Sequence, residues 1–589
     1  MQSVDFTTLM AACAELREGW LPSRIEQVYQ SDRFTIALGL RTFKQRGWLT
    51  LCWHPQGARL GLGEPPPRLP DTFTFSDQLR HQLVGLALSE IVAIAPWERV
   101  VDLKIAKRPG EAPRWHLYLE VMGKYSNAIL TDGSGQIVSV AHQVSAAQSS
   151  LRTVQTGQPY QPPPPLAGVA PSREEPLARW REQIALISGP LSRQLVKTYR
   201  GVSPVIARSL AQRAGLDPDR STAQLGDRDW ERLFESWQAW LHLLETEAFE
   251  PGWTETGYTL LGWEMTASAD SVQALLHRYY QTHLNQQAYE QLRHQLAQKL
   301  KNLLAKARQK AVDFRSRLQQ SAEADQLRYQ ADLLMAYLHQ WQAGMTQIAL
   351  PDFATGDLVT ISLEPEKNAV QNAQRLYKRH QKLKRAAGAI LPLLTAVTAE
   401  IEYLEQVEAS LSQLGDYHTL EDLSALEEIR EELIDQGYWD VPPQRRPPRQ
   451  TQPHHYQTPS GFLVLAGRNN RQNDELTFRT ASDYDLWFHT QEIPGSHVLL
   501  RLEPGAVPEA ADLQVAADLA AYFSRGRQSD RVPVVYTEPR HVYKPKGAKP
   551  GMAIYKQERI LWGRPQQAQQ FMEQKQSLPG ESKGNANSH

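Results

Sequence analysis

The sequence predicts an α+β protein of several domains, with mixed α/β domains near both ends and long helices between them. Three observations support this prediction. Apolar and alternating runs typical of strands fill residues 1–165, apolar residues recur every three or four positions between 271 and 436, and two Pro-rich segments separate these regions from their neighbours. The chain has 589 residues, which is enough for roughly three to five domains.

The first predicted domain covers residues 1–165. Residues 1–27 have the apolar spacing of a helix, and strands are expected in the runs RFTIALGLR, GWLTLCWHP and ARLGLG. The stretch FSDQLRHQLVGLALSEIVAIA should form a helix that leads into a strand. Residues 115–144 should form at least two strands around the turn signal Asp132–Gly133. The segment QPYQPPPP cannot continue a sheet or a helix, so it ends this domain.

Residues 174–247 are predicted to be entirely helical. Within them, LVKTYRGVSPVIARSLAQRAGL contains an apolar helix, a Gly201-Val202-Ser203 turn and a second apolar helix. This spacing resembles a helix-hairpin-helix domain, whose tight turn exposes backbone N–H groups that can hold a phosphate. A plain αα-hairpin that packs in a core has the same pattern and stays open as an alternative.

Residues 271–436 are predicted to form a long antiparallel coiled-coil arm. Two helical patterns with few Gly or Pro, 271–345 and 366–436, flank a short β-element near 348–364 where the chain reverses. At about 1.5 Å per residue, roughly 60–70 uninterrupted residues would reach on the order of 100 Å. Such a length suits a connection between distant surfaces.

Charge is sorted along this arm, although the net charge of the chain is only -1. Basic residues crowd the first helix from Arg293 to Arg317 and the start of the second from Lys378 to Arg385. We expect antiparallel pairing to bring these two runs face to face. A charge run is usually a solvated helix face, but two facing runs of one sign repel unless a polyanion neutralises them. The predicted RNA contacts are Arg308, Lys310, Lys378, Arg379 and Lys382.

The remainder of the chain divides into three parts after an acidic stretch. Glu400–Asp435 is almost purely acidic, with Arg430 as its only cation. A Pro-rich linker at 437–453 then introduces a small α/β domain at 454–565, with strands such as GFLVLAG and VPVVYT around an Ala-rich helix. Residues 566–589 are rich in Gln, Ser, Gly and Asn and should be a disordered tail.

Several classes of function are disfavoured by the composition. Cys13 and Cys52 form no CxxC pair, which excludes a cysteine-based zinc site and favours a reducing cytoplasm over a disulfide framework. The N-terminus lacks the apolar core of a secretory signal, and we find no run of about 18 apolar residues that would span a membrane. No P-loop, HExxH or GxSxG motif is present, so we expect no cofactor, no metal and no catalytic residue.

Several phrases carry a family resemblance. GRNNRQNDELTF (467–478), DLWFHTQEIPGSHVLLR (485–501) and KPKGAKPGM (544–552) resemble an NFACT-R domain in order and spacing. NAQRLYKRHQKLKRA (372–386) is similar to the phrase at which the coiled coil of that family resumes, and LEVMGKYSNAILTD (119–132) is similar to its NFACT-N domain. The chain thus resembles the NFACT family of ribosome quality-control proteins, of bacterial type, over nearly its whole length.

The resemblance implies a factor that binds the large (50S) ribosomal subunit, with its 23S rRNA and stalk-base proteins, when peptidyl-tRNA obstructs it. The N-terminal domain would recruit a tRNA, alanyl-tRNA in the family, for mRNA-independent tailing of the stalled nascent chain. Peptide bonds would be made by the ribosomal peptidyl-transferase centre, so this protein would act by positioning and not as an enzyme.

Three alternatives stay open. The first is a large-subunit and tRNA-binding factor without tailing activity. The second is a fibronectin-binding adhesin, which is the older name of the family. The third is a DNA glycosylase of the formamidopyrimidine type, which needs an N-terminal proline where this chain begins Met-Gln-Ser.

The resemblance also assigns candidate tRNA-binding residues. In the family an Asp-Arg pair is tied to tRNA capture, and the matching positions here are Glu98 and Arg99, so the carboxylate lies one methylene further out. Arg99 offers a forked donor to phosphates or base edges, and a surface ion pair is the structural alternative. The assigned residues are Asp5, Glu98, Arg99, Glu120, Met122, Gly123, Lys124, Ser126 and Asn127.

Each of these positions also has a structural interpretation. Asp5 precedes a helix and suits an N-cap. The polar phrase after Glu120 suits a tight turn, while its Gly, Lys, Ser and Asn would equally offer close approach and hydrogen-bond donors to a tRNA loop.

In the last domain, polar and cationic residues suggest contact with rRNA. The asparagines could read exposed bases or cap turns, and the lysine loop suits phosphates or is simply solvated. Trp487 should pack in the core, and the histidines should satisfy buried polar groups or touch RNA, because two histidines without a third ligand indicate no zinc site. The predicted ribosome-binding residues here are Asn469, Asn470, Asn473, His489, His497, Lys544, Lys546 and Lys549.

Overall fold

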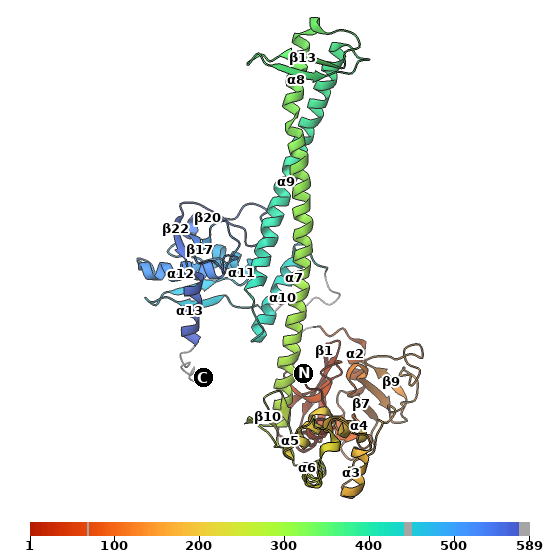
Figure 1. Ribbon diagram of the computed structural model, residues 1–589. Coiled ribbons are helices and arrows are strands. Elements are labelled where there is room, and N and C mark those ends of the chain that lie inside the picture. Colours follow the sequence, from red (N-terminus) through yellow and green to blue (C-terminus); the bar gives the residue numbers. More distant parts are fainter. Residues whose placement is uncertain (67–69, 441–449, 577–589) are drawn as a thin grey trace. The chain divides into compact units, whose positions relative to one another are not determined.

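The computed structural model describes residues 1–66, 70–440 and 450–576. The chain divides into two compact units, Met1–Asn285 and Gln286–His589. Figure 1 labels many of their helices and strands.

The first unit is built on a nine-stranded sheet with the order β4-β3-β2-β1-β5-β6-β7-β8-β9, in which every neighbouring pair is antiparallel. The chain passes through α2 (Thr74–Leu83) before it returns to the sheet beside β1. The strands are β1 (Ser23–Asp32), β2 (Thr35–Arg41), β3 (Arg46–Cys52), β4 (Arg59–Gly63), β5 (Ala87–Ala93), β6 (Val100–Ala106), β7 (Trp115–Glu120), β8 (Asn127–Asp132) and β9 (Ile137–Val140).

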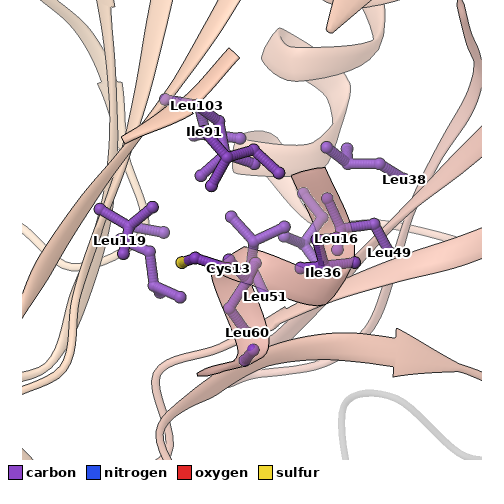
Figure 2. Packing of buried hydrophobic residues seen from close by; sticks show 14 of the residues in the cluster. Cys13, Leu16, Ile36, Leu38, Leu49, Leu51, Leu60, Ile91, Leu103 and Leu119 are labelled. Carbon is purple, nitrogen blue, oxygen red and sulfur yellow. The ribbon is translucent and has the colours of Figure 1, made fainter. Parts of the chain in front are cut away.

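Helix α1 (Phe6–Trp20) packs its apolar side on this sheet. Cys13 and Leu16 are fully buried among side chains of the strands (Figure 2). The expected helix over residues 1–27 is too long, because the chain turns at Leu21 and β1 begins at Ser23. Pro22 explains the stop, since proline disfavours the helical conformation of the residue before it.

The helical region of the first unit contains four α-helices among the described residues. Its core is unusually rich in tryptophan, with Trp180, Trp230, Trp237 and Trp240 all buried. The helices are α3 (Leu177–Ala185), α4 (Leu191–Thr198), α5 (Pro204–Arg213) and α6 (Asp227–Thr246), followed by the short strands β10 (Gly252–Trp253), β11 (Tyr258–Thr259) and β12 (Ala267–Ser268).

The second unit begins with long helices that pair in opposite directions. Both predicted helices are interrupted: the first at Glu323, and the second between Leu414 and Thr419, after which the chain folds back. The elements are α7 (Val272–Ala322), whose residues from Gln286 belong to this unit, α8 (Ala324–Ala336), β13 (Gln347–Pro351), β14 (Leu358–Ser362), α9 (Ala369–Gln413) and α10 (Leu420–Asp435). Leucines and tyrosines of α7, α9 and α10 form one core.

Contacts between these helices fix their register. The positions that meet are Tyr289 with Gly415, Arg308 with Glu405, Ala311 with Val397, and Ala324 with His380. The two basic runs therefore do not face each other, and that expectation was wrong. The Lys378–Arg385 run lies opposite the start of α8, and Arg308 pairs with an acid of α9. The spacing of residues within each helix does not determine this register, because it depends on where the helices break and reverse.

One described helix, α9, is long and apolar enough to cross a membrane by length and composition alone, but it contains no unbroken run of about 18 apolar residues. Among the described residues, α9 contains an 18-residue window with a mean hydropathy of 1.3, of which 17% is buried. The neighbouring α7 carries the exposed cations Lys306, Lys310 and Arg315, and cations are costly inside a bilayer. This window alone is weak evidence for a membrane span.

The last domain contains a six-stranded antiparallel sheet with the order β15-β16-β18-β17-β19-β22. Its strands are β15 (His454–Gln457), β16 (Leu463–Ala466), β17 (Leu486–Thr490), β18 (Val498–Leu500), β19 (Val532–Thr537) and β22 (Arg559–Gly563), with β20 (Val542–Tyr543) and β21 (Ile554–Tyr555) forming a separate pair. Helices α12 (Ala510–Tyr522) and α13 (Pro565–Gln576) share one core with the sheet, and α11 (Asn470–Glu475) lies outside it.

Part of the expected disordered tail is helical. Residues 566–576 belong to α13, and Ala568 is buried in the core of the domain. Alanine and methionine at helical spacing, Ala568 and Met572, supply the apolar side that the polar composition concealed. Residues 577–589, and the linker positions 441–449, lie outside the described residues.

Candidate nucleic-acid interface

The N-termini of two helices meet at Asp5 in the first unit. One carboxylate oxygen of Asp5 accepts a hydrogen bond from the backbone N of Thr8 at 2.8 Å, which makes Asp5 the N-cap of α1. The other oxygen accepts a hydrogen bond from Oγ of Ser203 at 2.6 Å. Ser203 is itself the N-cap of α5 and accepts a hydrogen bond from the backbone N of Ile206. Because Asp5 is 5% exposed, its role in this structure is to tie two helix starts together.

The turn between α4 and α5 is closed by its own neighbours. Gly201 has φ +73°, and a Cβ there would lie 2.6 Å from the ring of Trp97, so glycine is required at this position. The backbone N of Arg200 donates to the carbonyl of Val169 at 2.9 Å. Val202 and Ile206 are buried in the tryptophan-rich core. These features are those of an αα-hairpin that packs in a core.

Glu98 and Arg99 lie beside this junction, directly before β6. Glu98 accepts a hydrogen bond from the backbone N of Leu166 at 3.0 Å, and Nη1 of Arg99 donates to the carbonyl of Val4 at 3.2 Å. Both side chains are half-buried. The Arg99 guanidinium has five donor hydrogens and forms one side-chain hydrogen bond with a described residue, so it keeps donors for a ligand.

The loop after β7 lies next to Arg99. The backbone N of Val121 donates to the carbonyl of Arg99, and Glu120 pairs with Val100 across the two strands. The structure therefore brings together two groups of predicted tRNA-binding residues, around Arg99 and around Glu120, that are about 20 residues apart in sequence. Gly123 has φ +59° at the turn, where glycine avoids strain. Met122 is half-buried, and Lys124 is exposed.

Two residues of this phrase face inward. Glu120 is 1% exposed and accepts hydrogen bonds from Arg152 (3.0 and 2.5 Å) and from the Tyr160 hydroxyl (3.0 Å). Burial, with the nearby Glu120 charge, raises the pKa of Tyr160 above its usual range. Asn127 uses its amide to bind the backbone of His142 on both sides. These groups stabilise the sheet edge and are not available to a tRNA in this structure.

Sequence reasoning missed one exposed aromatic ring in the same loop. Tyr125 is 69% exposed, and Nζ of Lys124 lies 4.9 Å from the centre of its ring. Ser126, by contrast, is buried and accepts a hydrogen bond from the backbone N of Met122. A cation beside an exposed aromatic in a turn is a recognisable signal for base stacking. The exposed part of the phrase is thus Gly123-Lys124-Tyr125.

Most predicted cations of α7 and α9 are exposed. Lys310, Lys378, Arg379 and Lys382 face solvent, and none of them forms an ion pair with a described residue. No Asp or Glu occurs between Lys367 and Ala399 in the sequence. Arg308 differs, because it pairs with Glu405 at 2.6 Å. The surface around these residues of α9 is therefore rich in cations that form no ion pairs with described residues, although Glu323 and Asp325 lie at the start of α8, which this run faces.

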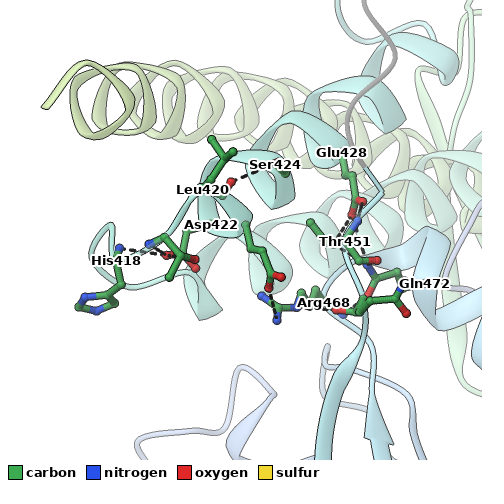
Figure 3. A network of polar contacts seen from close by, with 11 residues as sticks. His418, Leu420, Asp422, Ser424, Glu428, Thr451, Arg468 and Gln472 are labelled. Atoms are coloured by element: carbon green, nitrogen blue, oxygen red, sulfur yellow. Dashed lines mark hydrogen bonds and ion pairs between the residues drawn. The ribbon is translucent and has the colours of Figure 1, made fainter. Parts of the chain in front are cut away.

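The asparagines of the last domain are buried against α10. Glu428 of α10 accepts hydrogen bonds from the side chains of Thr451 (2.9 Å) and Gln472 (Figure 3). It also accepts a hydrogen bond from the side chain of Asn469 at 2.5 Å. One turn further along α10, Glu432 accepts from Asn470 at 3.0 Å. These carboxylates are 7% and 1% exposed. The acidic stretch of the chain is therefore a docking surface for the last domain.

Asn473 and the two histidines are also held inside the domain. Asn473 accepts a hydrogen bond from the backbone N of His497, whose Nδ1 lies 2.6 Å from Oγ1 of Thr477. Trp487 is 1% exposed and donates to the same hydroxyl at 3.0 Å. This confirms that Trp487 packs in the core. Burial lowers the pKa of His497 to about 3 and that of the half-buried His489 to about 4, so both imidazoles are neutral near pH 7.

The lysine loop is anchored rather than free. Lys544 pairs with Asp474, and Lys549 donates to the hydroxyl of Tyr438 while it lies over the ring of Tyr403. Burial lowers the pKa of Lys549. Lys546 is exposed and has no ion pair among the described residues. Of the three predicted lysines, Lys546 is the one placed to meet a phosphate.

The chain matches two family models. These are described as "NFACT N-terminal and middle domains", over residues 5–452, and "NFACT protein RNA binding domain", over residues 452–556. It is similar to the Rqc2 homolog RqcH of Streptococcus suis, with 31% identity over 575 residues that cover 95% of this chain and 97% of that protein. The Rqc2 homolog RqcH of Bacillus subtilis is 30% identical over 575 residues, which cover 94% and 96%.

Solved structures of related chains are also similar in part. The C-terminal part of the fibronectin/fibrinogen-binding protein from Streptococcus suis is 32% identical with a TM-score of 0.38, and covers 47% of this chain and 95% of that chain. The N-terminal part of the same protein is 24% identical with a TM-score of 0.38, and covers 47% and 99%. With TM-scores below 0.5, these likenesses add no conclusion.

Proposed function

Because this chain belongs to the NFACT family of ribosome quality-control proteins, we propose that it binds the 50S subunit obstructed by peptidyl-tRNA. There it recruits a tRNA, charged with alanine, for tailing of the stalled chain without mRNA. The protein works in the cytoplasm, and its helices α7 to α9 serve as a coiled-coil arm between separate RNA surfaces. Peptide-bond formation belongs to the ribosome, and this chain contributes position and local concentration.

The observation that carries the proposal is a run of exposed cations in α9 that form no ion pairs with described residues. Lys378, Arg379, Lys382, Lys384 and Arg385 are all exposed within two helical turns, and none has an ion pair among the described residues. Like charges at this spacing repel one another and cost stability. A polyanion such as rRNA removes that repulsion and gains free energy from the release of its counterions. RNA is thus the partner that best fits this surface.

The tRNA surface is proposed at the end of the first sheet. Arg99 retains free donors, and Gly123-Lys124-Tyr125 is exposed beside it. A guanidinium that forks to phosphates or base edges and a ring that stacks on a base are suited to an exposed RNA loop. Asp5, Glu120, Ser126 and Asn127 act indirectly in this proposal, because they hold the neighbouring backbone in place.

The proposal is tested by capture of the tagged full-length chain from cells, followed by sequencing of the bound RNA. The expected result is enrichment of 23S over 16S rRNA together with tRNA, with alanine tRNA the most enriched. Large-subunit rRNA without tRNA would contradict the tailing role and leave a subunit-binding factor. Capture of neither RNA would contradict the whole proposal.

A matched pair of variants makes this experiment specific. Lys124→Ala with Tyr125→Ala removes exposed groups only, and should reduce captured tRNA while 23S rRNA is retained. Exchange of Lys382, Lys384 and Arg385 for Gln should instead reduce the captured 23S rRNA. If both variants lost tRNA and 23S rRNA equally, the proposed division between two surfaces would be wrong.

A further inference from the structure

The β2–β3 hairpin of the first unit carries a fully exposed phenylalanine. Phe43 is 107% exposed, and no ring or cation of a described residue packs on it. A single exposed apolar residue needs no explanation by itself. What distinguishes Phe43 is the combination of a rigid turn beneath it and a row of arginines beside it.

The turn that presents Phe43 is tied down by hydrogen bonds. The backbone N of Thr42 donates to the carbonyl of Gln45 at 2.9 Å, and the Thr42 hydroxyl accepts from the backbone N of Lys44 and of Gln45. The Gln45 side chain donates to the carbonyl of Gly19 at 3.0 Å, at the end of α1. The ring is thus held out at a fixed place, so little conformational entropy is lost when a partner stacks on it.

Three arginines form a row across the strands at the base of this hairpin. Arg46 of β3 pairs with Arg41 of β2, and Arg41 pairs with Arg24 of β1. Directly paired residues of an antiparallel sheet project on the same face about 5 Å apart, where like charges are destabilising. Glu26 lies near two of them, at 3.3 Å from Arg41 and 3.5 Å from Arg46. Glu26 thus pairs with two of the three guanidinium groups, Arg24 has no ion pair with a described residue, and all three arginines are exposed.

More cations follow at the same end of the sheet. Ala87 of β5 pairs with Arg24 on one side and with Ala106 of β6 on the other, so the turn after β6 lies at this end as well. That turn begins with Lys107 and Arg108, which are exposed and have no ion pair among the described residues, and it also contains the exposed Glu111. Strands lie about 4.8 Å apart, so this basic edge extends over roughly 15–20 Å.

This edge is distinct from the proposed tRNA surface. Arg99 directly precedes β6 and the loop 123–125 comes after β7, at the opposite end of these strands, where Val100 pairs with Glu120. The two surfaces are therefore separated by the length of the strands. With seven residues in β6 at about 3.4 Å each, that separation is on the order of 20 Å.

A second exposed phenylalanine, Phe353, lies among residues of the opposite charge and serves as a comparison for Phe43. Phe353 follows β13 in the turn between β13 and β14 and is 56% exposed, but it packs near the rings of Tyr329 and Tyr337. Its turn contains Asp352 and Asp357 and no cation. Acids repel a phosphate backbone, whereas the neighbours of Phe43 attract it.

We propose that the edge formed by Phe43, Lys44 and the Arg24-Arg41-Arg46 row binds an unpaired segment of RNA. The guanidinium groups contact consecutive phosphates, and the phenyl ring stacks on a base. This inference rests on the proposed function, which identifies RNA as the partner. It adds a second RNA-binding surface on the first unit and says how that surface binds RNA.

The test measures binding of the full-length chain to a single-stranded RNA of about 12 nucleotides. Phe43→Ala and Phe43→Leu should both weaken binding by about fivefold or more, while Phe43→Trp retains it, because stacking needs a ring. Phe353→Ala is the matched control and should have no effect. The triple variant R24Q/R41Q/R46Q should lower the slope of log affinity against log salt by about 2, since single strands lose about 0.7 for each phosphate contact.

Stability separates binding from a structural role. Loss of three repelling charges should leave the melting temperature of the triple variant unchanged or higher, while its RNA binding falls. A lower melting temperature with unaltered RNA affinity would overturn the inference. So would equal binding by Phe43→Leu and wild type, or photocrosslinks from benzoylphenylalanine at position 43 that go to protein and not to RNA.

Failure of this inference is distinguishable from failure of the proposed function. If the wild-type chain captures 23S rRNA and tRNA while all these variants bind RNA as well as wild type, the second surface is refuted and the proposed function stands. If the wild-type chain binds no RNA, both are refuted.

Discussion

Two sequence motifs that suggested RNA binding differ in their exposure. They are residues 119–132 of the first unit and 467–478 of the second. In the first phrase, buried Glu120 and Asn127 flank an exposed Gly123-Lys124-Tyr125 tip. In the second, the asparagines are 1–2% exposed and bind carboxylates of α10 or the domain's own backbone. The difference teaches that a polar motif can be recognisable because it holds domains together. Only the exposed part of a motif can meet RNA directly.

The largest expected effect concerns Glu120. Glu120→Ala removes the partner of Arg152 and leaves a guanidinium whose side chain is 11% exposed without its ion pair. The free energy of unfolding should fall by about 3–5 kcal/mol, as measured by urea denaturation. Glu120→Gln keeps the shape and part of the hydrogen bonding, so it should be milder. If Glu120→Ala were as stable as wild type, Glu120 would not have the structural role assigned to it.

Asn469→Ala and Asn470→Ala test the second phrase. Each change leaves a buried carboxylate of α10 with one donor fewer, which should cost about 1–3 kcal/mol. Faster hydrogen exchange of α10 and of α11 would show that the last domain is loosened from the helix. Lys546→Ala changes an exposed residue of the same domain and should stay within about 0.5 kcal/mol of wild type. Reduced RNA affinity without any loss of stability would instead favour base reading by the asparagines.

Acid should destabilise the last domain before it affects the basic surfaces. The pKa of His497 is lowered to about 3 and that of His489 to about 4, so below pH 6.5 the unfolded chain binds protons that the folded chain does not. Stability therefore falls as pH falls, by about 1.4 kcal/mol per pH unit for each histidine. Thermal melts between pH 7 and 5 measure this slope. His497→Asn should reduce the slope, and an unchanged slope would contradict the burial of this imidazole.

The smallest effect on stability is expected at the exposed tip. Lys124→Ala should leave the melting temperature unchanged, because surface substitutions usually alter the free energy of unfolding by less than 0.5 kcal/mol. Its tRNA affinity should fall by about two- to tenfold through the loss of one phosphate contact. Lys104→Ala, at the other end of the same sheet and paired with Glu90, is the control. Equal tRNA binding by both variants would remove Lys124 from the proposed surface.

Sequence patterns predicted β2 and β3 from their mostly apolar runs, and the helical region that contains α6 from its helical spacing. They missed β1, because the polar sequence SRIEQVYQSD is also compatible with a continuation of the preceding helix. Pro22 is the local signal that marks the boundary. The relative register of α7 and α9 was not predictable, because it depends on the break at Glu323 and on the reversal at β13 and β14. Local spacing carries no information about such breaks.

The candidate site was predictable in place but not in orientation. The resemblance assigns both Arg99 and the Lys124 loop to tRNA binding, and the pairing of β6 with β7 brings them side by side. The inward direction of Asn469 could not be foreseen, because its partner Glu428 is 41 residues away and belongs to a stretch that seemed only acidic. Side-chain direction depends on such distant partners.

The most direct test of the central claim, that exposed cations rather than polar motifs hold RNA, is co-sedimentation with purified 50S subunits over a range of salt concentrations. Exchange of Lys378, Arg379, Lys382, Lys384 and Arg385 for Gln should abolish co-sedimentation at moderate salt and flatten its salt dependence, with an unchanged melting temperature. Wild-type co-sedimentation by this variant, or no co-sedimentation of the wild-type chain even at low salt, would contradict the account.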